Sequence, residues 1–173
     1  MEDTEHGRIP AGEGWFVLNA KDARWRTDAM GSLTFFEGDK AGFAQLGINV
    51  SVLEPGQPMA MYHYENDQED FLVLSGEPLL IVEGQERPLK AWDLVHCPPG
   101  TRHVIVGDGD GPSVLISVGS RSGREDWGAY TVDEAAIRHG AGVEQETTKS
   151  AEAYARFPAG TFTRYREGLL PEG

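Results

Sequence analysis

The chain has 173 residues, of which 39% are hydrophobic and 25% are charged, so its composition fits one globular domain and argues against disorder. The 15 Lys and Arg residues stand against 28 Asp and Glu residues, and the net charge of −13 argues against nucleic acid as a partner. The single cysteine, Cys97, excludes an internal disulfide. Because no apolar run is long enough to span a membrane and residues 1–13 do not resemble a secretory signal, we expect a cytoplasmic protein with no membrane partner.

Short apolar runs separated by Gly- and Pro-containing turns predict a series of β-strands. In chain order, the expected strands are residues 15–18, 33–36, 46–52, 71–74, 79–82, 93–97, 103–106 and 114–118. The clearest is 46–52, where large apolar residues alternate with small or polar ones, the pattern of a half-buried strand. This spacing, with no helix pattern between the strands, predicts an all-β antiparallel barrel over residues 14–120.

Helix signals appear only after the expected barrel. Thr131 and Glu134 have the spacing of a capping box and Gly140 provides a stop, so we expect a short helix over residues 132–139. Ser150 is the candidate cap of a second short helix.

Two terminal segments flank the expected barrel. Residues 121–173 contain too many large apolar side chains to stay in water, so we expect this C-terminal tail to pack on the barrel or on a second subunit. Residues 1–13 are polar, and we expect them to form a flexible N-terminal arm.

Histidine and carboxylate side chains lie at the ends of several expected strands: His63, Glu65, Glu69 and His103. Because side chains alternate along an extended chain, His63 and Glu65 share one face. Imidazole nitrogens and carboxylate oxygens suit divalent metals such as Fe, Mn, Ni and Zn. The sequence therefore predicts a metal site at the mouth of the barrel, with open positions for a substrate or water.

Two segments resemble the paired signatures of the cupin superfamily. Residues 56–76 read GQPMAMYHYENDQEDFLVLSG. This segment resembles the first signature, which consists of a glycine, a His-x-His motif, a glutamate and, after six further residues, a second glycine. Residues 92–103 read WDLVHCPPGTRH, which is similar to Gly-Asp, then Pro-x-Gly and a histidine. Trp92 replaces the first glycine of this second signature, a change that we expect to affect only a turn. The resemblance covers roughly residues 45–119 and implies a small single-domain cupin, an antiparallel double-stranded β-helix or jelly roll.

The resemblance places His63, Glu69 and His103 at metal-ligand positions and Glu65 where the family has its second histidine. Two interpretations of Glu65 stay open. It is either a fourth metal ligand, or it stays off the metal, hydrogen-bonds to a metal-bound water and acts as the catalytic general base. A third interpretation is a site without metal, although two carboxylates facing one interior without a cation are costly.

The resemblance implies a metal-dependent enzyme of the dioxygenase, decarboxylase or isomerase type that acts on a small polar metabolite. Its cofactor would be one divalent transition metal ion, Fe, Mn, Ni or Zn. The alternative is a non-catalytic cupin that binds or senses a small molecule, because a weakened ligand set can bind without catalysing. Small cupins often pair through their outer strands, so we also expect a homodimer.

Overall fold

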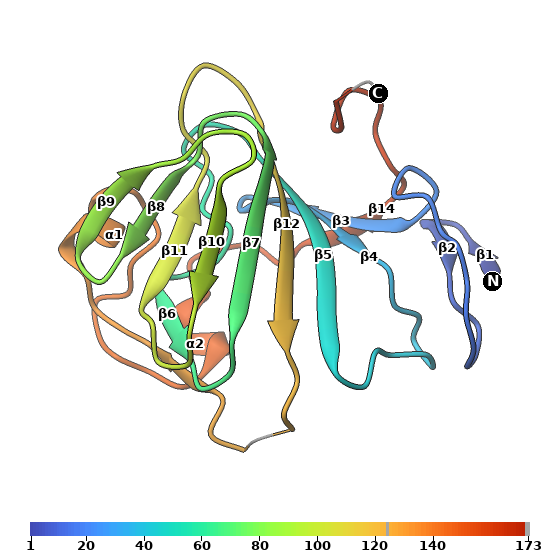
Figure 1. Cartoon of the computed structure of the whole chain (residues 1–173), viewed down its shortest axis with the longest axis horizontal. Helices are drawn as coiled ribbons and strands as arrows, with labels where there is room; N and C mark the ends of the chain where they lie inside the picture. The colour runs from blue at the N-terminus through green and yellow to red at the C-terminus, as the bar shows by residue number, and fades with distance from the viewer. Residues whose placement is uncertain (124, 172–173) are drawn as a thin grey trace.

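The computed structural model describes residues 1–123 and 125–171. Two large antiparallel sheets pack against each other, and a separate two-stranded sheet lies near the N-terminus (Figure 1). The larger sheet runs through β10 (Leu94–Cys97), β7 (Glu69–Ser75), β12 (Ser113–Ser120), β5 (Leu46–Leu53), β4 (Gly31–Phe35), β3 (Arg24–Asp28) and β14 (Thr161–Thr163). The smaller sheet runs through β13 (Gly128–Tyr130), β6 (His63–Glu65), β11 (His103–Val106), β8 (Leu79–Val82) and β9 (Gln85–Pro88). This arrangement confirms the predicted all-β antiparallel fold.

Apolar side chains from both sheets fill the space between them. They are Leu53, Phe71, Val73, Leu80, Val95, Cys97, Ile105 and Leu115. Because side chains alternate along a strand, each strand contributes every second residue to this interior. Full burial of one such side chain is worth about 1.5–3 kcal/mol, so this cluster is a main source of the attraction between the sheets.

The alternating strand at 46–52 forms as β5, but its apolar residues do not point into the barrel. Val50 and Val52 pack on the opposite face of the sheet with Trp25 and with Leu169 of the tail. The polar alternate, Ser51, faces the interior instead. Period-two alternation thus identified the strand correctly. Its apolar face packs against Trp25 and the tail, and its polar face lines the interior.

The C-terminal tail supplies strands to both sheets. β13 pairs with β6, and β14 pairs with β3, at opposite ends of the barrel (Figure 1). Both partners would otherwise have an exposed edge of unpaired N–H and C=O groups. The tail is therefore a structural part of the β-sheets and not only a covering layer.

Two short helices lie in the tail, as expected, but their first turns differ from the prediction. α1 (Glu134–Arg138) is capped by Asp133, whose carboxylate accepts a hydrogen bond from the Ala136 N–H, so the assignment of Thr131 as the cap was wrong. α2 (Ser150–Ala153) begins after Lys149 and has no side-chain cap bond. Neither helix, nor any other within the described residues, is long and apolar enough to cross a membrane.

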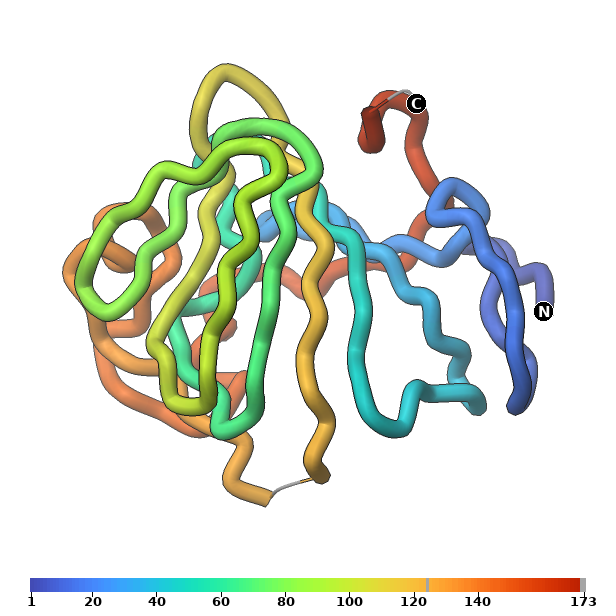
Figure 2. The backbone as a smooth tube through the Cα atoms, in the orientation of Figure 1, coloured from blue at the N-terminus to red at the C-terminus, as the bar shows by residue number. Residues whose placement is uncertain are grey.

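The N-terminal residues differ from the expectation in two places. Residues 1–13, expected as a flexible arm, contain a hairpin of β1 (Glu2–Thr4) and β2 (Gly7–Ile9). Arg164 of the tail donates a hydrogen bond of 2.9 Å to the Thr4 carbonyl, and the last described part of the tail lies on the same side of the molecule as the N-terminus (Figure 2). The strand expected at 15–18 does not form, and Trp15 there is 93% exposed.

Trp92, which stands where the cupin-like signature has a glycine, adopts a backbone conformation that favours glycine. Its φ is +76°, in the left-handed region, and its N–H donates to the Val73 carbonyl across the turn. The side chain is 74% exposed, so little packing offsets the strain. Trp92 thus lies in the turn before β10, and its backbone is bonded to β7.

Candidate metal centre

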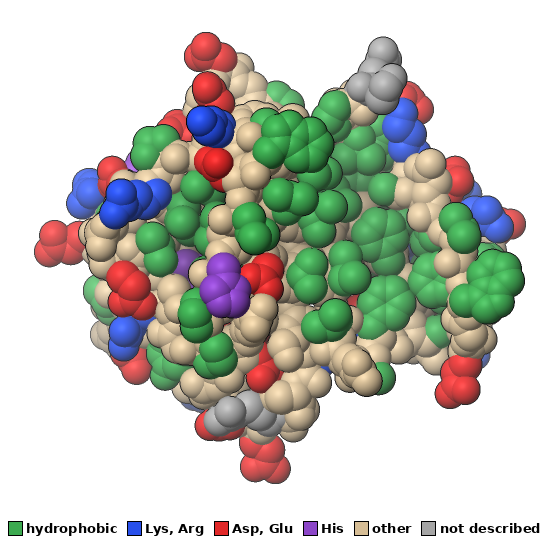
Figure 3. Space-filling view, viewed as in Figure 1, with side chains coloured by type: hydrophobic (Ala, Val, Ile, Leu, Met, Phe, Trp, Pro, Cys, Tyr) green, Lys and Arg blue, Asp and Glu red, His purple; other side chains and the backbone are tan. Residues whose placement is uncertain are grey.

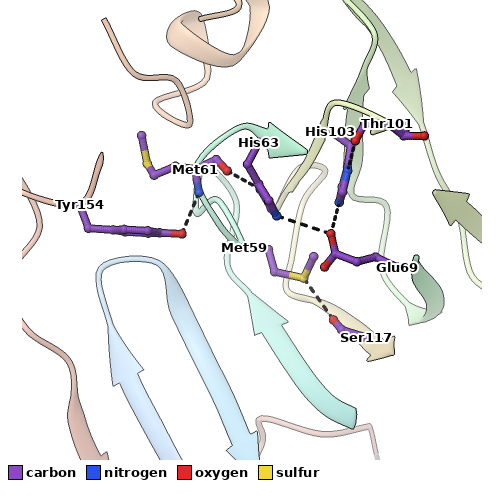
Figure 4. A network of polar contacts seen from close by, with 8 residues as sticks. All are labelled: Met59, Met61, His63, Glu69, Thr101, His103, Ser117 and Tyr154. Atoms are coloured by element: carbon purple, nitrogen blue, oxygen red, sulfur yellow. Dashed lines mark hydrogen bonds and ion pairs between the residues drawn. The ribbon is translucent and has the colours of Figure 1, made fainter. Parts of the chain in front are cut away.

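Three side chains from three strands converge at one end of the barrel (Figure 4). His63 opens β6 and His103 opens β11, and these two residues are direct partners in the smaller sheet. Glu69 opens β7 in the larger sheet. The group therefore joins the two sheets. The backbone hydrogen bonds of each sheet hold the strands that carry these side chains in place.

The converging atoms are close together and shielded from water. The Glu69 Oε2 atom lies 3.5 Å from His63 Nε2 and 3.4 Å from His103 Nε2. His63 is 8% exposed and His103 is 1% exposed. No hydrogen-bond partner among the described residues reaches Glu69 Oε2 or His103 Nε2. Buried polar atoms without a partner are rare, so these two atoms point to a missing positive species.

Hydrogen bonds on the far side of each ring fix the tautomers. His63 Nδ1 lies 2.7 Å from the Met61 carbonyl, and His103 Nδ1 lies 3.0 Å from the Thr101 carbonyl. A carbonyl only accepts, so Nδ1 carries the hydrogen and, in the neutral ring, Nε2 presents a lone pair. Two such lone pairs then face a carboxylate oxygen. This is the arrangement by which proteins orient histidine ligands toward a metal ion.

The spacing also fits a shared ion. Two atoms bound about 2.1 Å from one metal at a tetrahedral angle lie about 3.4 Å apart. The two Glu69–histidine distances of 3.4 and 3.5 Å agree with this value. Two imidazoles and one carboxylate are a donor set that suits Fe, Mn, Ni or Zn and leaves positions open.

The two histidines differ in their affinity for a proton. Burial opposes a charge on His63, but the contact with Glu69 and its negative charge outweigh burial and raise the pKa of His63. Burial lowers the pKa of His103, and the neighbouring His63 lowers it further. The group therefore attracts one positive charge and resists a second proton.

Glu65 lies outside the converging group but lines the same cavity. Burial, followed by repulsion from Glu69, raises the pKa of Glu65 to about 7. The structure thus does not bring Glu65 together with His63, Glu69 and His103 as a fourth member of the group. Its role as a ligand or as a base stays a prediction.

The cavity beside the group has a volume of about 250 Å³ and an aromatic wall that the sequence did not reveal. The wall consists of Trp127, Tyr130 and Tyr154, all from the tail. Trp127 and Tyr130 have ring centroids 5.0 Å apart, and Tyr130 and Tyr154 meet edge to face at 5.5 Å. The other lining residues are Leu33, Asn49, Ser51, Met59, Ala60, His63, Glu65, Glu69, Phe71 and Ser117.

Residues 49–119 match the family described as a cupin domain. Among solved structures, a polyketide cyclase, RemF, from Streptomyces resistomycificus is 12% identical, with a TM-score of 0.54, covering 62% of this chain and 80% of that chain. An RmlC-like cupin from Shewanella frigidimarina is 20% identical, with a TM-score of 0.53, covering 65% of this chain and 96% of that chain. These likenesses support the fold and leave the activity open.

A third structure, a proposed sugar phosphate isomerase from Acidithiobacillus ferrooxidans, is 28% identical, with a TM-score of 0.47. The match covers 60% of this chain, and it spans 62% of the length of that protein. No curated protein sequence matches the chain.

Proposed function

Because residues 49–119 match the family described as a cupin domain, we propose that the chain binds one divalent transition metal ion through His63, Glu69 and His103. The observation that carries this proposal is the meeting of three lone-pair atoms within 4.8 Å, in side chains that are buried and oriented by their own hydrogen bonds. A cation satisfies all three atoms at once. Fe, Mn, Ni and Zn each suit this donor set, so the ligands alone do not choose between them.

We further propose that the cavity converts a small polar metabolite, with Glu65 as the general base. When bound, the metal would supply Lewis acidity or redox chemistry of the dioxygenase, decarboxylase or isomerase type. Glu65 faces the same cavity, and a base is most effective when its pKa lies near the working pH. Burial raises the pKa of Glu65 to about 7 before any metal binds, and a bound cation would lower it again, so Glu65 would be ionised and able to accept a proton.

The alternative is a protein that binds a small molecule without converting it. The position of Glu65 favours this alternative, because the cupin-like signature has a histidine there and the converging group is left with three members. The metal identity separates the two functions. Redox-active iron favours oxygenase chemistry, and zinc or nickel is compatible with an isomerase or a binding protein.

Elemental analysis of the purified protein, before and after reconstitution with Fe, Mn, Ni or Zn, tests the proposal. We expect close to one metal ion per chain in the wild type and in Glu65→Gln, because Glu65 lies outside the converging group. Loss of metal in Glu65→Gln would instead make Glu65 a ligand. A wild-type protein that takes up none of the four metals would refute the metal site.

We also propose that the chain forms a homodimer through the outer face of the larger sheet. Figure 3 shows hydrophobic side chains over much of this face. Leu94, Leu72 and Ile116 form a continuous row, because each is the register partner of the next, and the tail covers the sheet beyond them at Val50. Leu94 is 67% exposed. We expect a dimer in light scattering at micromolar concentration and a monomer for Leu94→Lys; a monomeric wild type would contradict this proposal.

A further inference from the structure

Two further cavities adjoin the one beside the metal group, which we call the metal cavity. A junction cavity of about 100 Å³ shares four lining residues with the metal cavity: Leu33, Ser51, Met59 and Tyr154. An outer cavity of about 590 Å³ in turn shares four with the junction cavity: Arg26, Asp28, Met30 and Tyr154. Tyr154 lines all three. The cavities therefore follow one another in a row that leads from the metal group to the tail.

A buried hydroxyl marks the point where the metal cavity and the junction cavity meet. Ser51 is 2% exposed, and it lines both cavities. Its Oγ atom has no hydrogen-bond partner among the residues that the structure describes. Leaving a buried hydroxyl unpaired costs about 1–3 kcal/mol, so a polar atom that reaches this point, of water or of a bound molecule, is stabilised there.

The charges along the row disfavour an anion. Within the described chain, no Lys or Arg lines the metal cavity, while Glu65 and Glu69 do. Arg26 is the only basic residue that the described part of the chain contributes to the junction and outer cavities. Its guanidinium donates to the Asp28 carboxylate at 3.0 Å, so its charge is already balanced. A negatively charged ligand would find no free cation beyond the metal group itself.

The walls of the row suit an apolar body. The outer cavity is lined by Phe157, Pro158 and Ala159 together with Met30 and Tyr154. Met59 continues this surface into the metal cavity. Methionine side chains are flexible and polarisable and pack well against aromatic rings, so they adapt to a ligand of irregular shape.

We propose that the three cavities form one elongated binding site for an uncharged, largely apolar or aromatic molecule that carries oxygen groups at one end. This ligand is larger and less polar than the small polar metabolite that the resemblance implies, and only its oxygen-bearing end lies in the metal cavity. The oxygen-bearing end lies beside His63, Glu69 and His103. A polar atom farther along bonds to Ser51, and the apolar body passes Tyr154 into the outer cavity. The placement of the oxygen-bearing end rests on the proposed metal site, whereas the binding of the body does not.

The test uses two fluorescent dyes that differ by one sulfonate group, and its readout is dye binding and not metal-dependent activity. N-phenylnaphthylamine is uncharged, and anilinonaphthalenesulfonate has the same two aromatic parts with one added sulfonate. We expect the purified protein to bind one equivalent of the uncharged dye at least roughly tenfold more tightly than the sulfonated dye. Equal affinity for the two dyes, or no binding of the uncharged one, would overturn the proposal.

Three variants locate the binding. Met30→Trp fills the boundary between the junction and outer cavities and should weaken binding of the uncharged dye at least roughly tenfold. Val17→Trp adds the same side chain at a position that is 84% exposed and lines none of the three cavities, so binding should not change. Ser51→Ala removes the unpaired hydroxyl; it should weaken dye binding several-fold while leaving the melting temperature of the free protein unchanged or higher. If Met30→Trp and Val17→Trp bind the dye alike, the proposed site is wrong. Elemental analysis of the same preparations reports separately on the metal site.

Discussion

Replacing His103 with alanine is expected to weaken metal binding by about 100-fold or more. Loss of a residue that merely supports a ligand typically costs 10–100-fold in metal affinity, and His103 is itself one of three converging donors. Its ring is 1% exposed, and no other donor in the described chain joins this group to replace it. The affinity is measured by competition with a chelator of known strength, and the metal content by elemental analysis.

His96→Ala provides the matched control for this loss. His96 lies in β10, and its Nδ1 is 2.6 Å from the Asp70 carboxylate, in a pair that is not part of the converging group. We expect this variant to bind metal as the wild type does. Equal metal affinity in wild type and His103→Ala, or an equal loss in both variants, would show that the metal is held elsewhere or only non-specifically.

Replacing Gly76 with alanine is expected to lower the free energy of unfolding by about 3 kcal/mol, from about 1 kcal/mol of backbone strain and about 2 kcal/mol of crowding. The φ of Gly76 is +84°, which side chains rarely adopt. A Cβ atom there would also lie 2.6 Å from the Ser113 Cα and 2.7 Å from the Pro112 carbonyl oxygen. These are backbone atoms, so they cannot move aside without shifting β12. Urea denaturation measures the difference.

Gly56→Ala separates the two contributions. Gly56 has the same φ of +84°, but a Cβ atom there meets nothing within 4 Å. It should therefore show only the backbone strain, a loss of about 1 kcal/mol. If Gly56→Ala and Gly76→Ala are destabilised to the same extent, the close packing between β7 and the start of β12 is not what requires glycine at position 76.

Much of the barrel could be predicted from sequence because its strands are continuous apolar runs between strong turn signals. β3 was missed for the opposite reason. Its residues read RWRTD, with one large apolar side chain, and Trp25 becomes buried only through contacts with β5, β12 and the tail. β13 and β14 have three residues each, and such short segments become strands only because β6 and β3 offer an edge to pair with.

The candidate site also has one part that could be predicted from the sequence and one part that could not. His63, Glu69 and His103 could be selected because the cupin-like signatures fix their positions, and the structure brings the three together. The aromatic wall could not be selected, because Trp127 and Tyr130 reach the cavity through long-range strand pairing. The spacing of residues predicts which side chains share a face of one strand. It does not predict which strand of the barrel a distant segment such as β13 pairs with.

The late position of β13 has a consequence for how the protein is made. A ribosome releases the chain from its N-terminus, so β6 emerges well before the residues that cover its outer edge. Until β13 pairs, with Tyr130 opposite His63, the strand that carries His63 has an open edge of unpaired backbone groups. The growing chain therefore passes through a stage in which this edge invites contacts with other chains, and a chaperone that shields it would protect the unfinished barrel. The cavity acquires its aromatic wall only after this stage, so ligand and metal meet a complete site only once residues 127–154 have left the ribosome.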